Sequence, residues 1–331
     1  MDLDAYSTAH GAEWARLSQL AGQRTLDGSG ADELIDRYQS GAAQLSAIKT
    51  TVGESVQGDR LSLTLSRARL RFTGAATDPL RQLTVLFSQQ LPAALYRVRI
   101  VTLVCAALTI IVAVVYAVWV NSDPAVFAAL GPESYLRQLA EQDFVGYYSD
   151  NSEAGFTGQV WTNNALVAAQ CIGFGISGVW VPAALFSNAQ GIGLTAGVMA
   201  HFGHLDDFFL YIAPHGQLEL YTVFTAGAAG LLIFWSWIAP GARTRRQALA
   251  EDGRAFFTLV IGCAIFLLMS GLIEGIVTRQ PWPWPIKIGI GTVALAIVLV
   301  YQWVIGRRAY RAGQTGDLSE VEAGARQIIS A

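Results

Sequence analysis

The sequence predicts an all-α protein, a polytopic membrane helix bundle of about six transmembrane helices with a helical cytosolic N-terminal region. Three observations support this fold class. The chain of 331 residues is 53% hydrophobic and only 14% charged, whereas a soluble domain carries about 25% charged residues. Nearly half of the charge, 11 Lys+Arg and 10 Asp+Glu, lies in residues 1–99, and residues 138–242 contain no Lys or Arg. Several apolar stretches also reach the ~20 residues that cross a bilayer.

The cytosolic N-terminal region, residues 1–97, is predicted to form three or four short amphipathic helices. One helix is expected to begin at Asp32, and a second covers 60–72, where leucines alternate with arginines. Thr77-Asp78-Pro79 is typical of a helix start, and Leu91-Pro92 then leads into the membrane. A region of this length can form a core of its own or pack against the membrane domain.

Six spans are predicted in a membrane domain of residues 98–310. Single apolar stretches predict spans over 100–120, 256–277 and 286–305. Between them, residues 160–238 are long enough for three more spans, with breaks expected near Val181–Pro182 and around 201–215. The turn at 181–190 carries no charge, so both a full cytosolic turn and a re-entrant hairpin fit it.

Arginine placement predicts the orientation, because Lys and Arg are enriched in cytoplasmic loops. A six-span topology puts three clusters on one side: Arg97 and Arg99; Arg243, Arg245, Arg246 and Arg254; and Arg307, Arg308 and Arg311. The opposite loop, 121–160, contains one Arg and six acidic residues. We therefore expect a multi-pass bacterial cell-membrane protein in a lipid bilayer, with both termini, including the tail 311–331, in the cytoplasm.

The outer loop 121–160 is too long for a simple connection. Within it, the stretch Tyr135–Tyr148 is predicted to be a helix, because its apolar residues recur at helical spacing. These residues are Leu136, Leu139, Ala140 and Phe144. Two interpretations are open for this helix: it lies in the outer membrane interface, or it forms a lid packed on the bundle.

Composition excludes several classes of protein. The formal net charge of −3 argues against a nucleic-acid-binding protein, which would show a basic face. Cys105, Cys171 and Cys263 lie far apart in apolar runs, so they predict neither a disulfide framework nor a zinc site. The sequence contains no Gly-rich phosphate loop and no recognisable nucleophile–base pair. No catalytic or cofactor-binding residue is therefore predicted, and a protein without enzymatic activity is the simpler interpretation.

Polar residues at membrane depth form the candidate site, because ionisable groups there are costly and tend to be functional. His215 and Glu219 are four residues apart and share a helical face, and Pro214 suits the first turn of their helix. The expected topology places these two residues near the outer end of the fourth span. The predicted outward-facing polar pocket comprises Asn163, Asn164, His215, Glu219 and Glu274.

Three interpretations of these polar residues are open. They fix the bundle by hydrogen bonds between helices, they bind a solute or lipid head group, or they bind a metal ion. The weak metal-ligand candidates are His201, His204, His215 and Glu219. Catalytic zinc uses three protein ligands and a water, but no HExxH-type spacing is present. A solvated outer hairpin is the better interpretation of His201, His204, Asp206 and Asp207.

Glycines within the spans predict close packing of helices. Gly193 and Gly197 have the small-xxx-small spacing that lets two helix backbones approach each other. Such a face suits tight packing within one bundle or an interface between copies. A homo-oligomer is therefore a further expectation.

Short motifs follow one another along the chain: Asn163-Asn164, Pro214-His215-Gly216 with Glu219-Leu220, Gly227 and Gly230, Pro240-Gly241, and Glu274-Gly275. Their order and spacing resemble the stage II sporulation protein M family of bacterial membrane proteins. Further stretches resemble the longer, actinobacterial-type members: Met1-Asp2-Leu3-Asp4, Glu13-Trp14, Arg37-Tyr38-Gln39 and Pro92-Ala93. One departure is Trp161-Thr162, where Phe-Ser or a similar pair is expected.

The resemblance implies a role in assembling envelope proteins. The founding member acts in the engulfment step of sporulation and anchors peptidoglycan-degrading partners, whereas longer relatives need not sporulate. These longer relatives tend to be encoded near a MoxR-type AAA+ ATPase and von Willebrand factor-like proteins. The expected function is thus a scaffold or anchor with protein partners at the cytosolic region and the outer loop. A transporter or lipid-handling protein is the alternative, and a membrane metallohydrolase is less favoured.

Overall fold

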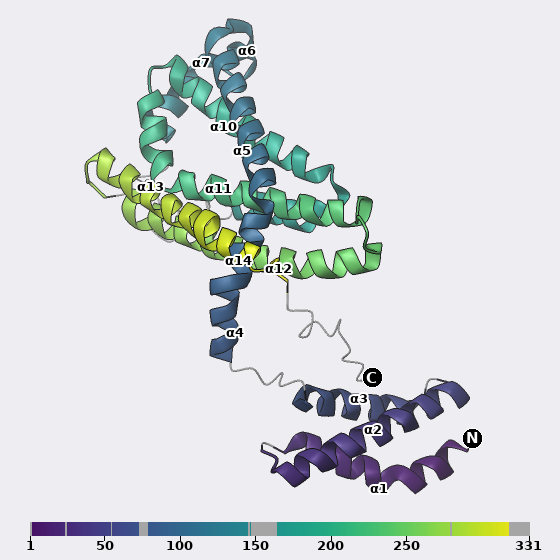
Figure 1. The fold of residues 1–331 in the computed structure, drawn as a ribbon. Helices are drawn as coiled ribbons and strands as arrows, with labels where there is room; N and C mark the ends of the chain where they lie inside the picture. The colour runs from purple at the N-terminus through teal and green to yellow at the C-terminus, as the bar shows by residue number, and fades with distance from the viewer. Residues whose placement is uncertain are drawn as a thin grey trace. The chain divides into compact units, whose positions relative to one another are not determined.

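The computed structural model describes residues 2–23, 25–53, 55–72, 79–144, 146, 164–278 and 280–317. All regular structure in these ranges is helical, as the sequence predicts (Figure 1). The chain forms two compact units, of which the first extends to Gln82 and the second begins at Leu83.

The first unit contains three helices: α1 (Leu3–Gly22), α2 (Gly28–Thr51) and α3 (Val56–Phe72). The start of α2 differs from the prediction of Asp32. The Asp27 carboxylate accepts a hydrogen bond from the Gly30 N–H at 2.8 Å, and this cap satisfies a backbone donor that would otherwise have no partner at the helix start. The helix therefore begins at Gly28, and Asp32 lies inside it.

The first unit has a hydrophobic core of its own, to which each helix contributes. The buried residues are Leu17, Leu20, Leu34, Ile48, Leu61, Leu65 and Ala68. On its surface, Arg16 of α1 donates two hydrogen bonds to Glu33 of α2, at 3.0 and 2.6 Å. Arg37 donates a third, at 3.0 Å. These arginines hold the pKa of Glu33 at about 2, below its ordinary value of 4.5.

The second unit begins within α4 (Pro79–Val85), which continues through η1 (Leu86–Gln90) into α5 (Leu91–Ser122) as one long helix. The π-helical turn η1 directly precedes Pro92. Proline lacks a backbone N–H and crowds the preceding turn, so the wider turn falls where regular hydrogen bonding is interrupted. The predicted helix start at Pro79 and the predicted entry at Leu91-Pro92 both fall in this segment.

Within the residues that the structure describes, four helices are long and apolar enough to cross a membrane: Gln82–Ser122, Leu205–Ile238, Arg245–Thr278 and Trp284–Arg311. They coincide with the predicted first, fourth, fifth and sixth spans. They comprise α4–α5, α11 (Leu205–Ile238), α12 (Arg245–Ile273) with η4 (Glu274–Thr278), and α13 (Trp284–Val300) with η5 (Tyr301–Gly306) and α14 (Arg307–Arg311).

The region predicted to hold the second and third spans is less regular. It contains a short apolar helix, Asn164–Gly173, then η3 (Gly175–Ser177) and α10 (Trp180–His201). The break precedes the predicted Val181–Pro182, and residues 181–190, which were predicted to form a turn, lie inside α10. Gly178 adopts a φ of +72° in the turn, a conformation that costs glycine little, whereas Pro182 fits the first turn of α10.

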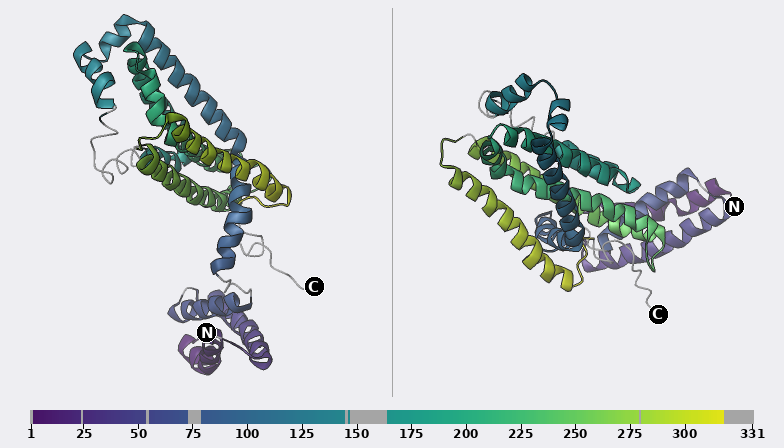
Figure 2. Two further views of the ribbon diagram at one scale, coloured as in Figure 1. Left: turned by 90° about the vertical axis from the view of Figure 1, so that its left-hand side faces the viewer. Right: turned by 90° about the horizontal axis from the view of Figure 1, so that it is seen from above.

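α11 is the central helix of the second unit, packing against α5, α10, α12 and α13 (Figure 2). Gly193 and Gly197 of α10 face α5, where an added Cβ would overlap the Ala113 and Ala117 carbonyls and the Val120 side chain. Their small-xxx-small face is therefore used inside the chain.

The described part of the loop 121–160 forms α6 (Pro124–Ala129), α7 (Glu133–Gln138) and η2 (Leu139–Asp143). The helix predicted over 135–148 is present to Phe144, and residues 145, 147 and 148 lie outside the described residues. Leu136 and Ala140 are buried in a cluster with Val120, Met199 and Phe208. This segment is therefore a lid on α5, α10 and α11.

An ion network joins three helices of the second unit. Asp252 of α12 is only 2% exposed and accepts hydrogen bonds from Arg97 of α5 at 2.5 Å and from Arg243 at 3.1 and 3.0 Å. Ser236 of α11 donates another at 2.7 Å. Tyr310 of α14 lies 5.6 Å from Tyr96, ring centre to ring centre. The three predicted arginine clusters therefore meet at one end of the unit.

Replacing Asp252 by Asn should lower the free energy of unfolding by on the order of 3 kcal/mol, because two arginines would lose their shared carboxylate. The change would be measured as a lower Tm of the full chain in detergent. Glu251→Gln is the matched control. It removes a one-third exposed partner of Arg243, and exposed pairs contribute about 0–1 kcal/mol. Equal Tm values for the two variants would contradict a structural role of the network.

The first unit should lose stability in acid through Glu33. Because its pKa is depressed to about 2, its contribution is present above the unfolded value of 4.5 and is lost as the pH falls from 4.5 toward 2. Hydrogen exchange of α1 and α2 peptides in the full chain, compared between wild type and Glu33→Gln, measures this contribution. The hydrogen exchange of these peptides should differ clearly between the two proteins at pH 6, and less at pH 3. A difference independent of pH would rule out the ion pairs as its cause.

Candidate functional site

Three ionisable side chains meet inside the second unit. His215 Nε2 lies 4.0 Å from Glu219 Oε2 and 3.7 Å from Glu274 Oε1. His215 and Glu219 are each 2% exposed, and Glu274 is fully buried. The structure thus brings together three of the predicted pocket residues in a closed cluster, which we call the buried triad.

The elements around the triad explain its geometry. Glu219 lies one turn after His215 in α11. Glu274 is the first residue of η4, the π-helical turn that follows α12. Ser270 Oγ donates to the His215 carbonyl at 2.9 Å, and Thr278 Oγ1 lies 3.4 Å from His215 Nδ1. The hydroxyls at 270 and 278 therefore flank Glu274 on the side of α12 that faces α11.

Pro214 was predicted to lie in the first turn of its helix, but it lies inside α11. The helix begins at Leu205, so His215 is about 15 Å along it. A proline inside a helix removes one backbone hydrogen bond. Gly291 of α13 packs against this position, because an added Cβ there would overlap the Pro214 carbonyl. α13 therefore approaches α11 closely at this position.

Further polar groups surround the triad. Asn164, at the start of the short helix, is a hydrogen-bond partner of Glu219. Lys287 Nζ of α13 donates to the Thr278 carbonyl at 2.8 Å. Sequence reasoning did not single out Ser270, Thr278 or Lys287. Two signals were present: residues 270, 274 and 278 share a helical face, and Lys287 is the only Lys after Lys49.

The remaining predicted residues lie outside the triad. His201 is exposed at the end of α10 and stacks on Phe127 with ring centres 3.9 Å apart. His204 Nδ1 is 3.0 Å from Asp207 Oδ2, in the turn before α11. Asn163 lies outside the described residues. In the described ranges, no group of three or more His, Cys, Asp or Glu side chains is arranged to hold a metal ion.

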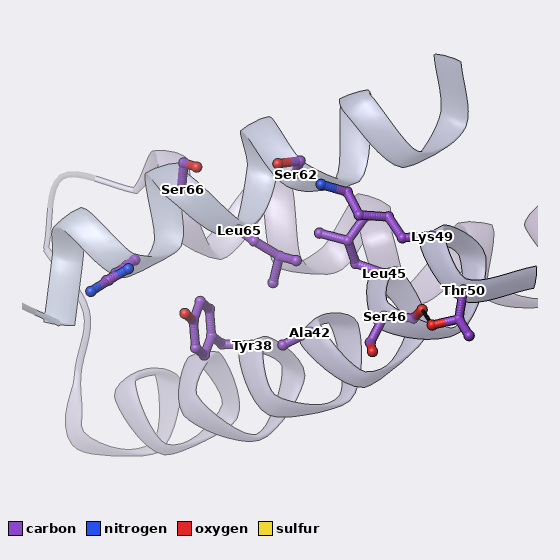
Figure 3. Close-up of a pocket in the computed structure, with 10 residues that line it drawn as sticks. Tyr38, Ala42, Leu45, Ser46, Lys49, Thr50, Ser62, Leu65 and Ser66 are labelled. Atoms are coloured by element: carbon purple, nitrogen blue, oxygen red, sulfur yellow. Dashed lines mark hydrogen bonds between the residues drawn. The ribbon is translucent and has the colours of Figure 1, made fainter. Parts of the chain in front are cut away.

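A second candidate site is an open groove of about 550 Å³ in the first unit (Figure 3). Leu45 of α2 and Leu65 of α3 lie between the two helices, with Tyr38 toward one end and Lys49 toward the other. The full lining is Tyr38, Ala42, Leu45, Ser46, Lys49, Thr50, Ser62, Leu65, Ser66 and Arg69. An apolar floor with hydroxyl and cationic rims is suited to binding a helix or an extended peptide. Sequence reasoning did not identify this groove.

Replacing Glu219 by Ala should destabilise the second unit by roughly 1–3 kcal/mol, because Asn164 and His215 would lose a buried polar partner. The measurement is the Tm and the oligomeric state of the full chain in detergent. Glu219→Gln, which keeps the shape and a carbonyl acceptor, should lose less. An unchanged Tm in the Ala variant would show that Glu219 does not support the fold.

Comparison with known families identifies both parts of the chain. The model of the family described as stage II sporulation protein M matches residues 102–279, which include α10, α11 and the buried triad. A domain of unknown function (DUF8413) matches residues 4–74, which cover α1 to α3. Searches of curated proteins and of solved structures found no match. Because the first match covers more than half of the sequence, this chain belongs to the stage II sporulation protein M family.

Proposed function

We propose that this protein is a scaffold or anchor for envelope-associated protein complexes. In this proposal the membrane domain, residues 98–310, fixes the protein in the bilayer, and the cytosolic region, residues 1–97, binds a partner. The observation that carries the proposal is the groove between α2 and α3, in a unit that has its own core. An anchor needs such a binding surface outside its membrane domain.

The proposed topology has six spans, with both termini and the tail 311–331 in the cytoplasm. The short helix and its turn support a second span, because Asn164 is beside Glu219 and the Ile176 carbonyl accepts from Trp237 Nε1 at 3.0 Å. Residues 219–237 cover about 27 Å along α11, close to the ~30 Å hydrocarbon thickness. The end of the second unit where the three arginine clusters meet supports the assignment of both termini to the cytoplasm, because Lys and Arg are enriched in cytoplasmic loops.

The groove fits an amphipathic helix of a partner protein. Its floor is formed by Ala42, Leu45 and Leu65, and Lys49 and Arg69 supply positive charge at its rim. Acidic side chains on both edges of an apolar helix face would complement this arrangement. The lid α6–η2 offers a second surface for a partner on the other side of the membrane.

A transporter or lipid-handling protein is the second candidate. The buried triad favours it, since ionisable groups at membrane depth often mark the path of a substrate. The scaffold remains the better proposal, because the three side chains are at most 2% exposed. Metallohydrolysis has no supporting observation in the described residues.

Copurification from native membranes in mild detergent tests the scaffold. Wild-type chain should retain a stoichiometric protein partner, and Lys49→Glu should lose most of it by reversing a charge on the groove. Arg60→Glu is the matched control, because Arg60 is exposed on α3 but does not line the groove. The control should retain the partner.

Mass spectrometry of protein and lipid in the same sample separates the two candidates. A chain that purifies without any protein partner, yet carries a defined lipid or solute, would overturn the scaffold in favour of transport or lipid handling. Equal partner loss in Lys49→Glu and Arg60→Glu would place the binding surface elsewhere on the first unit.

A further inference from the structure

We propose that the outward face of α3 binds the anionic lipid surface of the membrane. The proposal goes beyond the scaffold function, which rests on the groove between α2 and α3, because it assigns a lipid partner to a different side of the same unit. It takes from the proposed topology only that the first unit lies in the cytoplasm, where the membrane leaflet carries anionic lipids.

α3 exposes aliphatic side chains on the side that faces away from its core. Leu61, Leu65 and Ala68 are buried in that core. Val56 and Leu63 are instead 64% and 62% exposed, the highest values among the large hydrophobic side chains described in α1 to α3. These two residues are seven apart, so they lie on one face of the helix, about two turns from each other.

Arginines share this outward face. Arg60 follows Val56 by four residues and Arg67 follows Leu63 by four, so each aliphatic side chain has an arginine one turn further along the helix. Both arginines are exposed. A guanidinium group can contact lipid phosphates while its methylene stem lies along apolar surface. The face therefore offers apolar contacts and phosphate contacts side by side.

Positive charge in the first unit is concentrated in α3. This helix carries four arginines and one acidic residue, Asp59, whereas α1 and α2 together carry five acidic and three basic residues. An anionic membrane surface attracts basic segments, by roughly fivefold in affinity for each Lys or Arg close to it. The attraction therefore favours an orientation in which α3, and not α1 or α2, faces the lipid.

The chain connection supports lipid as the occupant of this face. α3 ends at Phe72 and α4 begins at Pro79, so the connecting residues can span at most about 25 Å. α4 runs into the apolar helix Gln82–Ser122. Because the first unit is tethered to a membrane-spanning helix, its contact with the bilayer is intramolecular, and even a weak contact is populated at high effective concentration.

Binding through this face leaves the groove free for a protein partner. Leu65 and Arg69 line the groove, and each follows Leu63 or Arg67 by two residues. Residues two apart point about 200° apart around a helix. The lipid-facing side and the groove side of α3 are therefore distinct, and the two contacts can be tested separately.

The test uses the full chain in vesicles of phosphatidylcholine alone, or of phosphatidylcholine with an equal amount of phosphatidylglycerol. Both contain a trace of lipid with a photoreactive headgroup, and mass spectrometry maps the cross-linked peptides. We expect cross-links on α3 in the anionic vesicles and few on α1. The α3 yield should be at least about fivefold lower in neutral vesicles, in high salt or in Arg67→Glu. Lys49→Glu, a charge reversal on the groove, is the matched control and should keep the α3 cross-links.

Equal cross-linking of α1 and α3, or an α3 yield that does not change with lipid charge and salt, would overturn the proposal. So would an Arg67→Glu chain that loses a copurified protein partner and keeps its lipid cross-links, because the face would then bind protein. The comparison of vesicles uses the wild-type chain, so it does not depend on the folding of a variant. The scaffold fails separately, if Lys49→Glu keeps its protein partner.

Discussion

The membrane unit depends on one physical constraint: a charged side chain in a membrane-spanning helix must be neutralised or placed at an end of the helix. The structure meets this constraint at two places. Asp252 lies among Arg97, Arg243 and Ser236, and the triad gathers an imidazole and two carboxylates. Both places use α11 and α12, so the polar contacts also determine how these two helices align.

The two polar centres differ in how their charges are balanced. Asp252 has two arginines as partners, and both arginines keep part of their surface exposed. The triad is closed and contains more acidic than basic groups among its described members. The first centre therefore cross-links α5, α11 and α12, whereas the second joins α11 to η4 through side chains that are closed off from solvent.

Local sequence rules predicted the elements whose signals are strong. Long apolar runs identified three of the four apolar helices directly, and the motif at Pro79 and the residues from 135 to 144 located helices correctly. The errors fall where a competing local interaction decided the boundary. Asp27 and not Asp32 caps α2, Gly178 and not Pro182 forms the turn before α10, and Pro214 lies inside α11, where Gly291 of α13 packs against it.

The sequence by itself determined the helical class, the membrane unit and the pairing of His215 with Glu219, because each depends on composition or on spacing along one helix; the order of its short motifs indicated the family. Only the tertiary structure decided that Glu274 approaches the same imidazole, that His201 and His204 lie elsewhere, and that α2 and α3 leave a groove. These facts depend on which faces of distant helices meet. Side-chain packing selects those faces, and no local pattern in the chain encodes them.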